Sequence, residues 1–343
     1  MPRLARGVFV FRLKPPRGIQ QSNMATEESV ISGPALPEAK MHLAPVHTPV
    51  IGTVISNERC TASNKATGFV HHVAIDVSGT ALEGNFLSGQ SFGVIPPGTD
   101  AKGLSHKVRL YSIASPTFGE DGKGRVLATT VKRLIDEHHE TGKLFLGVAS
   151  NHLCDLKPGD KVTISGPNGK RFLLPADVDA HDYVFFATGT GIAPFRGMIL
   201  ELLARKTVSR IVLVMGSTYA SDLLYHKELE ALSASHSNFT YLPTQSRERQ
   251  ADGKAAMYVQ DRLKTDAETL MPILASPRGL VYVCGIAGME LGILRNLATS
   301  LDPAARAQYV AVDDAAMADP NSWDRKMIHK QIRPTRRVFL EVY

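Results

Sequence analysis

Residues 183–206 read YVFFATGTGIAPFRGMILELLARK, and this stretch decides the class of fold. Five apolar residues come first, the small-residue turn TGTG follows, and an amphipathic segment begins at Pro194. A strand that is buried on both faces has such a continuous apolar run, and proline is favoured at the first position of a helix. The pattern therefore predicts a strand, a tight turn and a helix, the repeating unit of a doubly wound parallel sheet.

The same alternation continues towards the C-terminus. Apolar runs at 211–215 and 280–284 precede amphipathic segments at 222–234 and 288–301. Apolar strands that alternate with helices are typical of a parallel sheet covered by helices on both faces. We therefore predict an α/β domain with a doubly wound parallel sheet over residues 177–343.

Upstream of this domain the pattern is different, because the segments are short and alternate between apolar and polar residues. They occur at 73–77, 126–131, 143–148 and 161–165. Glycine- and proline-rich turns separate them, which predicts an antiparallel barrel or sandwich over residues 46–176. One short helix is expected within 134–140.

Residues 1–45 are rich in proline, glycine, serine and arginine and show no sustained period. We expect a flexible basic tail. The acid-free, arginine-rich start weakly resembles an organelle transit peptide, while Met24 and Met41 are alternative translation starts.

Composition narrows the class of protein further. At 343 residues, with 43% hydrophobic and 21% charged residues, the chain is expected to fold into two domains of a water-soluble protein. No apolar run approaches the ~18 residues of a membrane-spanning helix. Three separated cysteines, Cys60, Cys154 and Cys284, exclude a disulfide framework and a four-cysteine iron–sulfur cluster. These features favour the cytoplasm, and no metal site is expected.

The net charge of +6 comes mostly from the two ends of the chain. A nucleic-acid binder would concentrate such an excess on one stripe with interleaved aromatic residues. The distribution therefore argues against nucleic acid and favours an acidic protein partner or a phosphorylated ligand.

Two segments carry candidate chemistry. The GTGIAP turn at 189–194 lies between a strand and a helix, where small residues and free N–H groups can approach a pyrophosphate. In RLYSIAS at 109–115, alternation places Arg109 and Tyr111 on one face and Ser112 on the other. Arginine can pair with a diphosphate and tyrosine can lie on a flat ring. Taken alone, the first segment could equally be a structural turn, and the second a charged edge strand.

Eight motifs in a fixed order resemble the plant-type ferredoxin–NADP(+) reductase family. They are RLYSIAS (109–115), VKRL (131–134), GVASNHLCDLKPGD (147–160), GTGIAPFR (189–196), SRE (246–248), MYVQ (257–260), YVCGIAGME (282–290) and EVY (341–343). The resemblance extends over about residues 48–343. The chain is also similar to the reductase component of benzoyl-coenzyme A epoxidase systems, which shares the module.

The resemblance implies an FAD-binding antiparallel β-barrel followed by an NADP(H)-binding domain. It assigns three segments to FAD. These are Arg109, Leu110, Tyr111 and Ser112; Thr130, Val131 and Lys132; and Val148, Ala149 and Ser150. Lys132 is also expected near the phosphates of NADP(H).

For NADP(H), the resemblance assigns residues from several loops. They are Thr190, Gly191, Ser217, Thr218, Ser246, Arg247, Tyr258, Gln260, Gly285 and Ile286. Arginine, hydroxyl and aromatic groups suit a 2′-phosphate and an adenine ring, so NADP(H) is expected to be preferred over NAD(H).

The chemical centre implied by the resemblance is Ser112, Cys284 and Glu341. These residues would hold the flavin and nicotinamide rings in a reactive geometry. Tyr343 matches a terminal aromatic residue that stacks on the flavin until the nicotinamide replaces it.

Three positions depart from the family pattern. Ala149 stands where a cysteine is common, which bears on flavin tuning and electron transfer. Asp136 stands where an adenine-stacking tyrosine is expected, so that either FAD is held less tightly or His138 or His139 serves as the flat partner. Ala256 replaces a phosphate-binding lysine, for which the nearby Lys254 is a candidate substitute.

The implied function is an FAD-dependent ferredoxin–NADP(+) reductase that acts as a monomer with ferredoxin or flavodoxin. One alternative is an NADPH-dependent reductase component that serves an oxygenase or epoxidase through a separate iron–sulfur protein. Another is a non-catalytic flavin-binding module.

Overall fold

The computed structural model describes residues 33–61, 66 and 68–343. The expected basic tail falls largely on residues 1–32, which lie outside the described residues. Its remainder, residues 33–45, is hydrogen-bonded to the barrel. Ala44 forms a bridge with Gly166, and the Ala176 backbone N–H donates to the Ala35 carbonyl at 2.9 Å.

The first half of the described chain forms an antiparallel sheet of six strands in the order β4-β3-β8-β1-β2-β5. The strands are β1 (Val50–Arg59), β2 (Val70–Asp76), β3 (Ser91–Val94), β4 (Arg109–Ser112), β5 (Val126–Lys132) and β8 (Lys161–Asn168). A bridge between Ile113, just after β4, and Thr129, inside β5, connects the two edge strands. The sheet therefore curls into the expected barrel, and its apolar side chains meet in one core.

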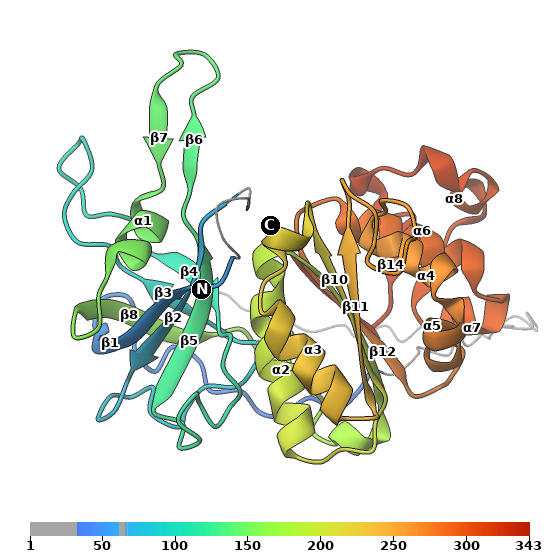
Figure 1. Cartoon of the computed structure of the whole chain (residues 1–343), viewed down its shortest axis with the longest axis horizontal. Helices are drawn as coiled ribbons and strands as arrows, with labels where there is room; N and C mark the ends of the chain where they lie inside the picture. Colours follow the sequence, from blue (N-terminus) through green and yellow to red (C-terminus); the bar gives the residue numbers. More distant parts are fainter. Residues whose placement is uncertain (1–32, 62–65, 67) are drawn as a thin grey trace, which may run out of the picture. The chain divides into compact units, whose positions relative to one another are not determined.

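A hairpin of β6 (Ile135–Glu137) and β7 (Leu144–Leu146) projects from this barrel and leads into α1 (Val148–Asp155) (Figure 1). The prediction of a short helix within 134–140 is wrong, because this segment forms a strand that pairs with β7, with Asp136 opposite Phe145. The charged run LIDEHHE has helical composition. However, cross-strand pairing and the turn at Gly142, with a φ of +63°, decide its conformation.

The second half confirms the predicted doubly wound parallel sheet, with strand order β11-β10-β9-β12-β15. The strands are β9 (Asp182–Thr188), β10 (Ile211–Ser217), β11 (Phe239–Gln245), β12 (Gly279–Gly285) and β15 (Val338–Val342). Alternate residues of β9 enter different cores: Phe185 packs on one side of the sheet and Phe186 on the other. Burial on both faces explains why the strands have continuous apolar runs.

Helices cover both faces of this sheet. Those packed in the first core are α2 (Ile192–Ala204) and α3 (His226–Ser235); those in the second are α4 (Arg262–Thr265), α5 (Ala267–Leu274) and α6 (Met289–Ser300). The connection from α6 to β15 contains α7 (Pro303–Ala307), β13 (Val310–Val312), α8 (Asp314–Ala318) and β14 (Ile332–Pro334). Short 3₁₀ turns lie at Val178–Ala180, Gly189–Gly191, Ala220–Asp222, Val259–Asp261, Pro320–Ser322 and Arg325–Met327.

Among the described helices, none combines the length and the apolar character needed to cross a bilayer. The cysteines Cys60, Cys154 and Cys284 are all free thiols.

Candidate functional site

A cavity of about 920 Å³ lies between the barrel and the end of β15. Thirteen of the predicted residues line it: Arg109, Leu110, Tyr111, Ser112, Thr130, Val131, Lys132, Val148, Ala149, Ser150, Thr190, Glu341 and Tyr343. All four residues of β4 are included, so the cavity extends around this edge strand rather than along one face of it.

Local hydrogen bonds hold the walls of this larger cavity in place. The Thr129 hydroxyl donates to the Ser112 carbonyl at 2.8 Å, which fastens β5 to β4. The Ser150 hydroxyl accepts from the Leu134 backbone N–H at 3.2 Å and donates to the Gly147 carbonyl at 3.2 Å. The start of α1 is thus fixed beside the end of β5.

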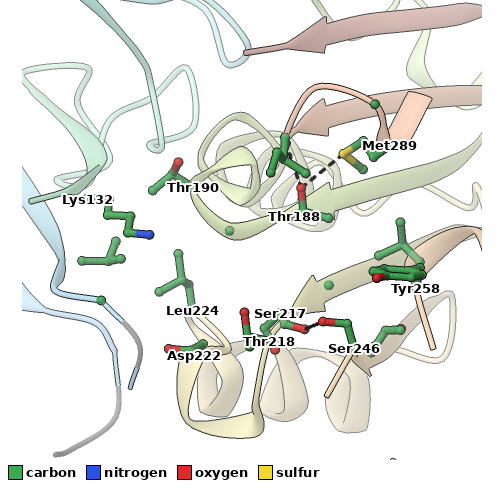
Figure 2. A pocket seen from close by; sticks show the side chains of 18 of the residues that line it. Lys132, Thr188, Thr190, Ser217, Thr218, Asp222, Leu224, Ser246, Tyr258 and Met289 are labelled. Carbon is green, nitrogen blue, oxygen red and sulfur yellow. Dashed lines mark hydrogen bonds between the residues drawn. The ribbon is translucent and has the colours of Figure 1, made fainter. Parts of the chain in front are cut away.

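A second cavity, of about 580 Å³, lies at the carboxyl ends of the parallel strands. The predicted residues that line it are Lys132, Thr190, Ser217, Thr218, Ser246, Tyr258, Gln260, Ile286 and Tyr343. Figure 2 shows Lys132 on one side of this smaller cavity and Ser246 and Tyr258 on the other. Ligands of open α/β sheets bind at this edge.

Backbone contacts shape the smaller cavity. The Ser246 hydroxyl and backbone N–H both donate to the Ser217 carbonyl, at 3.2 and 3.0 Å. The Thr188 hydroxyl accepts from the Ile286 backbone N–H at 2.9 Å and lies 3.2 Å from the Met289 sulfur (Figure 2). Glycine is required at Gly285, because its φ is +146° and a Cβ there would collide with Thr188.

The two cavities meet at Tyr343, Thr190 and Lys132, which line both. The Tyr343 hydroxyl lies 2.5 Å from the Thr190 hydroxyl oxygen. The Tyr343 backbone N–H donates to the Gly285 carbonyl at 3.0 Å, and its carbonyl accepts from Ala287 at 2.9 Å. The backbone of the last residue is therefore anchored while its side chain remains 62% exposed at the boundary.

Glu341 and Cys284 are cross-strand partners on β15 and β12, behind this boundary. The Glu341 Oε2 atom is buried and has no hydrogen-bond partner among the described residues. Burial raises the pKa of the Glu341 carboxyl above its ordinary value. Burial, reinforced by the charge of Glu341, also raises the pKa of the Cys284 thiol. Both groups are thereby biased towards their neutral forms.

Four predicted site residues do not line either cavity. Gly191 and Cys284 lie behind the boundary, where a Cβ on Gly191 would collide with the Cys284 carbonyl. Gly285 supports the turn against Thr188. Arg247 is exposed next to Ser246, and its backbone N–H donates to the Thr218 carbonyl at 3.1 Å.

The structure adds residues that the sequence analysis missed. His106, Lys107 and Phe145 line the larger cavity, and Asp222 and Leu224 line the smaller one. The alternation in 143–148 could have pointed to Phe145 if 134–140 had been recognised as its partner strand. Asp222 and Leu224 carry no sequence signal, because only the packing of their loop against the barrel brings them to the cavity.

Several proteins similar to this chain carry the name ferredoxin–NADP reductase. A family model described as "Oxidoreductase NAD-binding domain" matches residues 185–294. A ferredoxin–NADP reductase from Spirulina sp is 41% identical over 251 residues, which span 71% of this chain and 84% of that protein. One from Thermosynechococcus vestitus is 38% identical over 302 residues, or 84% of this chain and 76% of that protein.

Solved structures give the same picture of the fold. The ferredoxin–NADP+ reductase of Plasmodium falciparum aligns with a TM-score of 0.64 at 22% identity. The alignment covers 88% of this chain and 99% of that structure. At this identity the comparison supports the two-domain architecture alone.

Proposed function

The chain belongs to the ferredoxin–NADP reductase family. From that membership we propose that its larger cavity binds FAD and its smaller cavity binds NADP(H). The protein is an FAD-dependent oxidoreductase that couples hydride transfer with NADP(H) to electron transfer with ferredoxin. The observation that carries the proposed division is that the two cavities share a boundary at Tyr343 and Thr190. No observation favours an oxygenase reductase or a non-catalytic flavin module.

The residues of the larger cavity fit FAD. Its volume of about 920 Å³ lies at the upper end of small-molecule sites. It offers the guanidinium of Arg109 and the ammonium groups of Lys107 and Lys132 for a diphosphate, and the rings of Tyr111 and Tyr343 for flat surfaces. When bound, FAD would exchange two electrons with NADP(H) and pass single electrons to the acceptor.

In the smaller cavity, Ser246 and Tyr258 would hold the adenosine end of NADP(H), with Arg247 supplying the positive charge for the 2′-phosphate. All three come from the loops that follow β11, and Ser246 is fixed by its two bonds to the Ser217 carbonyl. Thr190, at the opposite end, would border the nicotinamide. An arginine–phosphate pair of this kind favours NADP(H) over NAD(H).

At the boundary, the residues of the chain position rings. Tyr343 would cover the passage between the cavities, and its ring would have to move before a nicotinamide ring could approach the flavin. Glu341, whose carboxyl is shifted by burial towards its protonated form, would place at this boundary a buried oxygen that has no partner among the described residues. Ser112 lines the larger cavity, and Cys284 packs behind the boundary.

The partner is ferredoxin, and we propose flavodoxin as a second acceptor. We also propose that the protein works as a monomer, because both cavities are built from a single chain. The three free cysteines support a reducing location, for which we propose the cytoplasm.

Two measurements test this function. Protein denatured after purification should release FAD, and the native protein should oxidise NADPH with ferricyanide and then with ferredoxin. Release of FMN, or a colourless protein without NADPH oxidation, would overturn the assignment of the larger cavity.

A further inference from the structure

Tyr225 lies between the two domains and joins polar groups from both. It precedes α3 and has a φ of +56°, a left-handed conformation that is rare for a bulky residue. Its hydroxyl is 2.5 Å from the Thr130 hydroxyl and 2.9 Å from the His72 Nδ1, both on barrel strands. These contacts offset the cost of a conformation that an isolated tyrosine would avoid.

A cluster of charged side chains also contacts the Tyr225 ring. The Arg196 guanidinium lies 5.1 Å from the centre of this ring. The same guanidinium pairs with Glu228 of α3 at 2.9 Å and with Glu120 of the barrel at 2.7 Å. The Arg196 side chain is only 11% exposed, so this cluster fastens α2, α3 and the barrel around Tyr225.

The residues next to Tyr225 connect it to both cavities. Thr130, its hydrogen-bond partner, lines the larger cavity and does not line the smaller one. Leu224 and Asp222, which precede Tyr225 in the chain, line the smaller cavity. A single side chain therefore bonds to the wall of one cavity while its own backbone continues the wall of the other.

We propose that Tyr225 is a positioning residue that couples the NADP(H) cavity to the flavin cavity through its hydroxyl contact with Thr130. The proposal rests on the function assigned to the two cavities. Displacement of Leu224 by the dinucleotide would move Tyr225 and so change the position of the Thr130 hydroxyl beside the flavin. In return, the placement of Thr130 would set the resting position of the loop that receives the dinucleotide.

Removing the Tyr225 hydroxyl should break this coupling while the ring stays in place between the two domains. In Tyr225→Phe the ring stays beside Arg196 and His72, but its hydroxyl contacts with Thr130 and His72 are both lost. The bond to Thr130 alone is worth about 1 kcal/mol in a typical protein, or roughly a fivefold change in an equilibrium constant. We expect the dissociation constant of NADP(+), titrated through the flavin absorption band, to rise about fivefold. The flavin content should remain that of the wild type.

Thr130→Val and the double variant make the experiment specific. Thr130 lies outside the NADP(H) cavity, yet Thr130→Val should also weaken NADP(+) binding, whereas Thr130→Ser should not. If Tyr225 acts through Thr130, the double variant Tyr225→Phe/Thr130→Val should bind NADP(+) no more weakly than either single variant. Tyr183→Phe is the matched control, because Tyr183 is also buried and donates to the Val178 carbonyl at 2.8 Å within one domain.

Effects that add in the double variant would overturn the coupling. So would a lower melting temperature for Tyr225→Phe with an unchanged NADP(+) dissociation constant, since that is the result of a purely structural contact. If Tyr225→Phe fails to fold, Thr130→Val decides alone: NADP(+) binding equal to that of Thr130→Ser would overturn the proposal. A wild-type protein whose flavin band does not respond to NADP(+) would refute the proposed function itself.

Discussion

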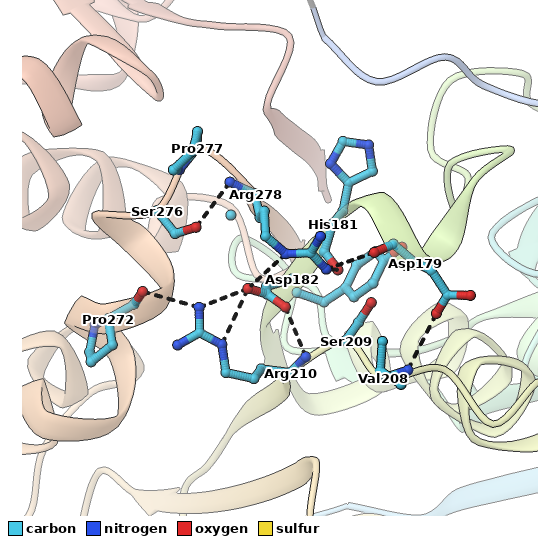
Figure 3. A network of polar contacts seen from close by, with 12 residues as sticks. Asp179, His181, Asp182, Val208, Ser209, Arg210, Pro272, Ser276, Pro277 and Arg278 are labelled. Carbon is cyan, nitrogen blue, oxygen red and sulfur yellow. Dashed lines mark hydrogen bonds and ion pairs between the residues drawn. The ribbon is translucent and has the colours of Figure 1, made fainter.

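The two ends of the parallel sheet differ in how their polar groups are satisfied. At the amino end of β9, the Asp182 carboxylate is 4% exposed and accepts from the Arg210 backbone N–H at 2.9 Å and guanidinium at 2.7 Å. The Arg278 guanidinium lies 3.5 Å away and binds the Asp179 carbonyl at 2.7 Å (Figure 3). At the carboxyl end, Glu341 keeps a buried oxygen without a partner among the described residues, and Tyr343 is exposed.

This difference suggests that the amino end of the sheet mainly stabilises the fold and that the carboxyl end mainly binds ligands. Buried polar groups are normally hydrogen-bonded, and the Asp182 carboxylate follows this rule, although the nearby His181 Nδ1 and the Tyr309 hydroxyl have no partner among the described residues. At the carboxyl end, the orphaned Glu341 oxygen and the exposed Tyr343 ring border the cavities proposed to bind FAD and NADP(H). Changes at the amino end should therefore alter unfolding, while changes at the carboxyl end should alter coenzyme binding.

The largest effect should come from the carboxyl end. Arg247→Ala should lower kcat/KM for NADPH about a hundredfold, mainly by raising KM, because a charged pair with phosphate contributes about 3 kcal/mol. Activity with NADH and the melting temperature should stay unchanged. Arg249→Ala, whose guanidinium donates to the Gly253 carbonyl in the same loop, is the control. Equal losses with both coenzymes would remove Arg247 from the 2′-phosphate site.

The next effect should appear at the amino end as a loss of stability. Asp182→Asn should lower the free energy of unfolding by about 2 kcal/mol, less than for a fully buried pair because both arginines can regain water. Steady-state kinetics should not change. Asp313→Asn, which breaks an exposed pair with Arg333, should cost much less. Chemical denaturation of both variants checks this, and equal losses would contradict the contrast.

Tyr343 should show a smaller effect of the opposite kind. Replacing it with serine should tighten NADP(+) binding about two- to tenfold, because stacking of an aromatic ring contributes ~0.5–1.5 kcal/mol. Activity with NADH should rise relative to NADPH, and turnover should fall as the bound rings separate more slowly. Titration of the flavin band measures the binding. Tyr343→Phe keeps the ring and should stay close to the wild type, and an unchanged dissociation constant for Tyr343→Ser would mean that the ring does not cover the flavin.

The smallest effect is the pH dependence of the free energy of unfolding, and its sign should differ between the two ends of the sheet. Burial would raise the pKa of Asp182, but hydrogen bonds and charge from Arg210, together with the charge of Arg278, lower it below its ordinary value. This carboxylate therefore stabilises the fold above about pH 4, and the benefit is lost as the pH falls through its folded pKa. The deficit of Asp182→Asn should consequently shrink in acid.

Glu341 has a raised pKa, so its contribution to stability is fully present below the ordinary value of 4.5 and is lost as the pH rises through the folded pKa. Glu341→Gln should therefore unfold no more easily than the wild type at pH 7, with a gain that disappears in acid. Urea denaturation of the flavin-free variants from below about pH 3 up to pH 8 compares the two signs, because the Asp182 benefit is lost only below about pH 4. A deficit for Glu341→Gln that grows with pH would contradict the burial argument.

Much of the fold could be predicted from local patterns. The apolar run before the GTGIAP turn and its repeats at 211–215 and 280–284 indicated parallel strands, because burial on both faces demands such runs. The segment 134–140 could not be assigned in this way. Its composition favours a helix, but pairing with β7, between residues seven to eleven positions apart in the sequence, decides the outcome.

The sequence by itself indicated an antiparallel barrel followed by a doubly wound parallel sheet, and its resemblance to a family indicated the residue types that suit FAD and NADP(H), but it wrongly suggested a helix at 134–140. These features depend on periodicity and on motifs that are local in the chain. The tertiary structure alone decided that Tyr343 reaches Thr190, that Phe145 joins the larger cavity and that Tyr225 bonds to Thr130. Each of these contacts brings together residues from separate strands or loops, and their distances depend on how whole elements pack, which no local pattern encodes.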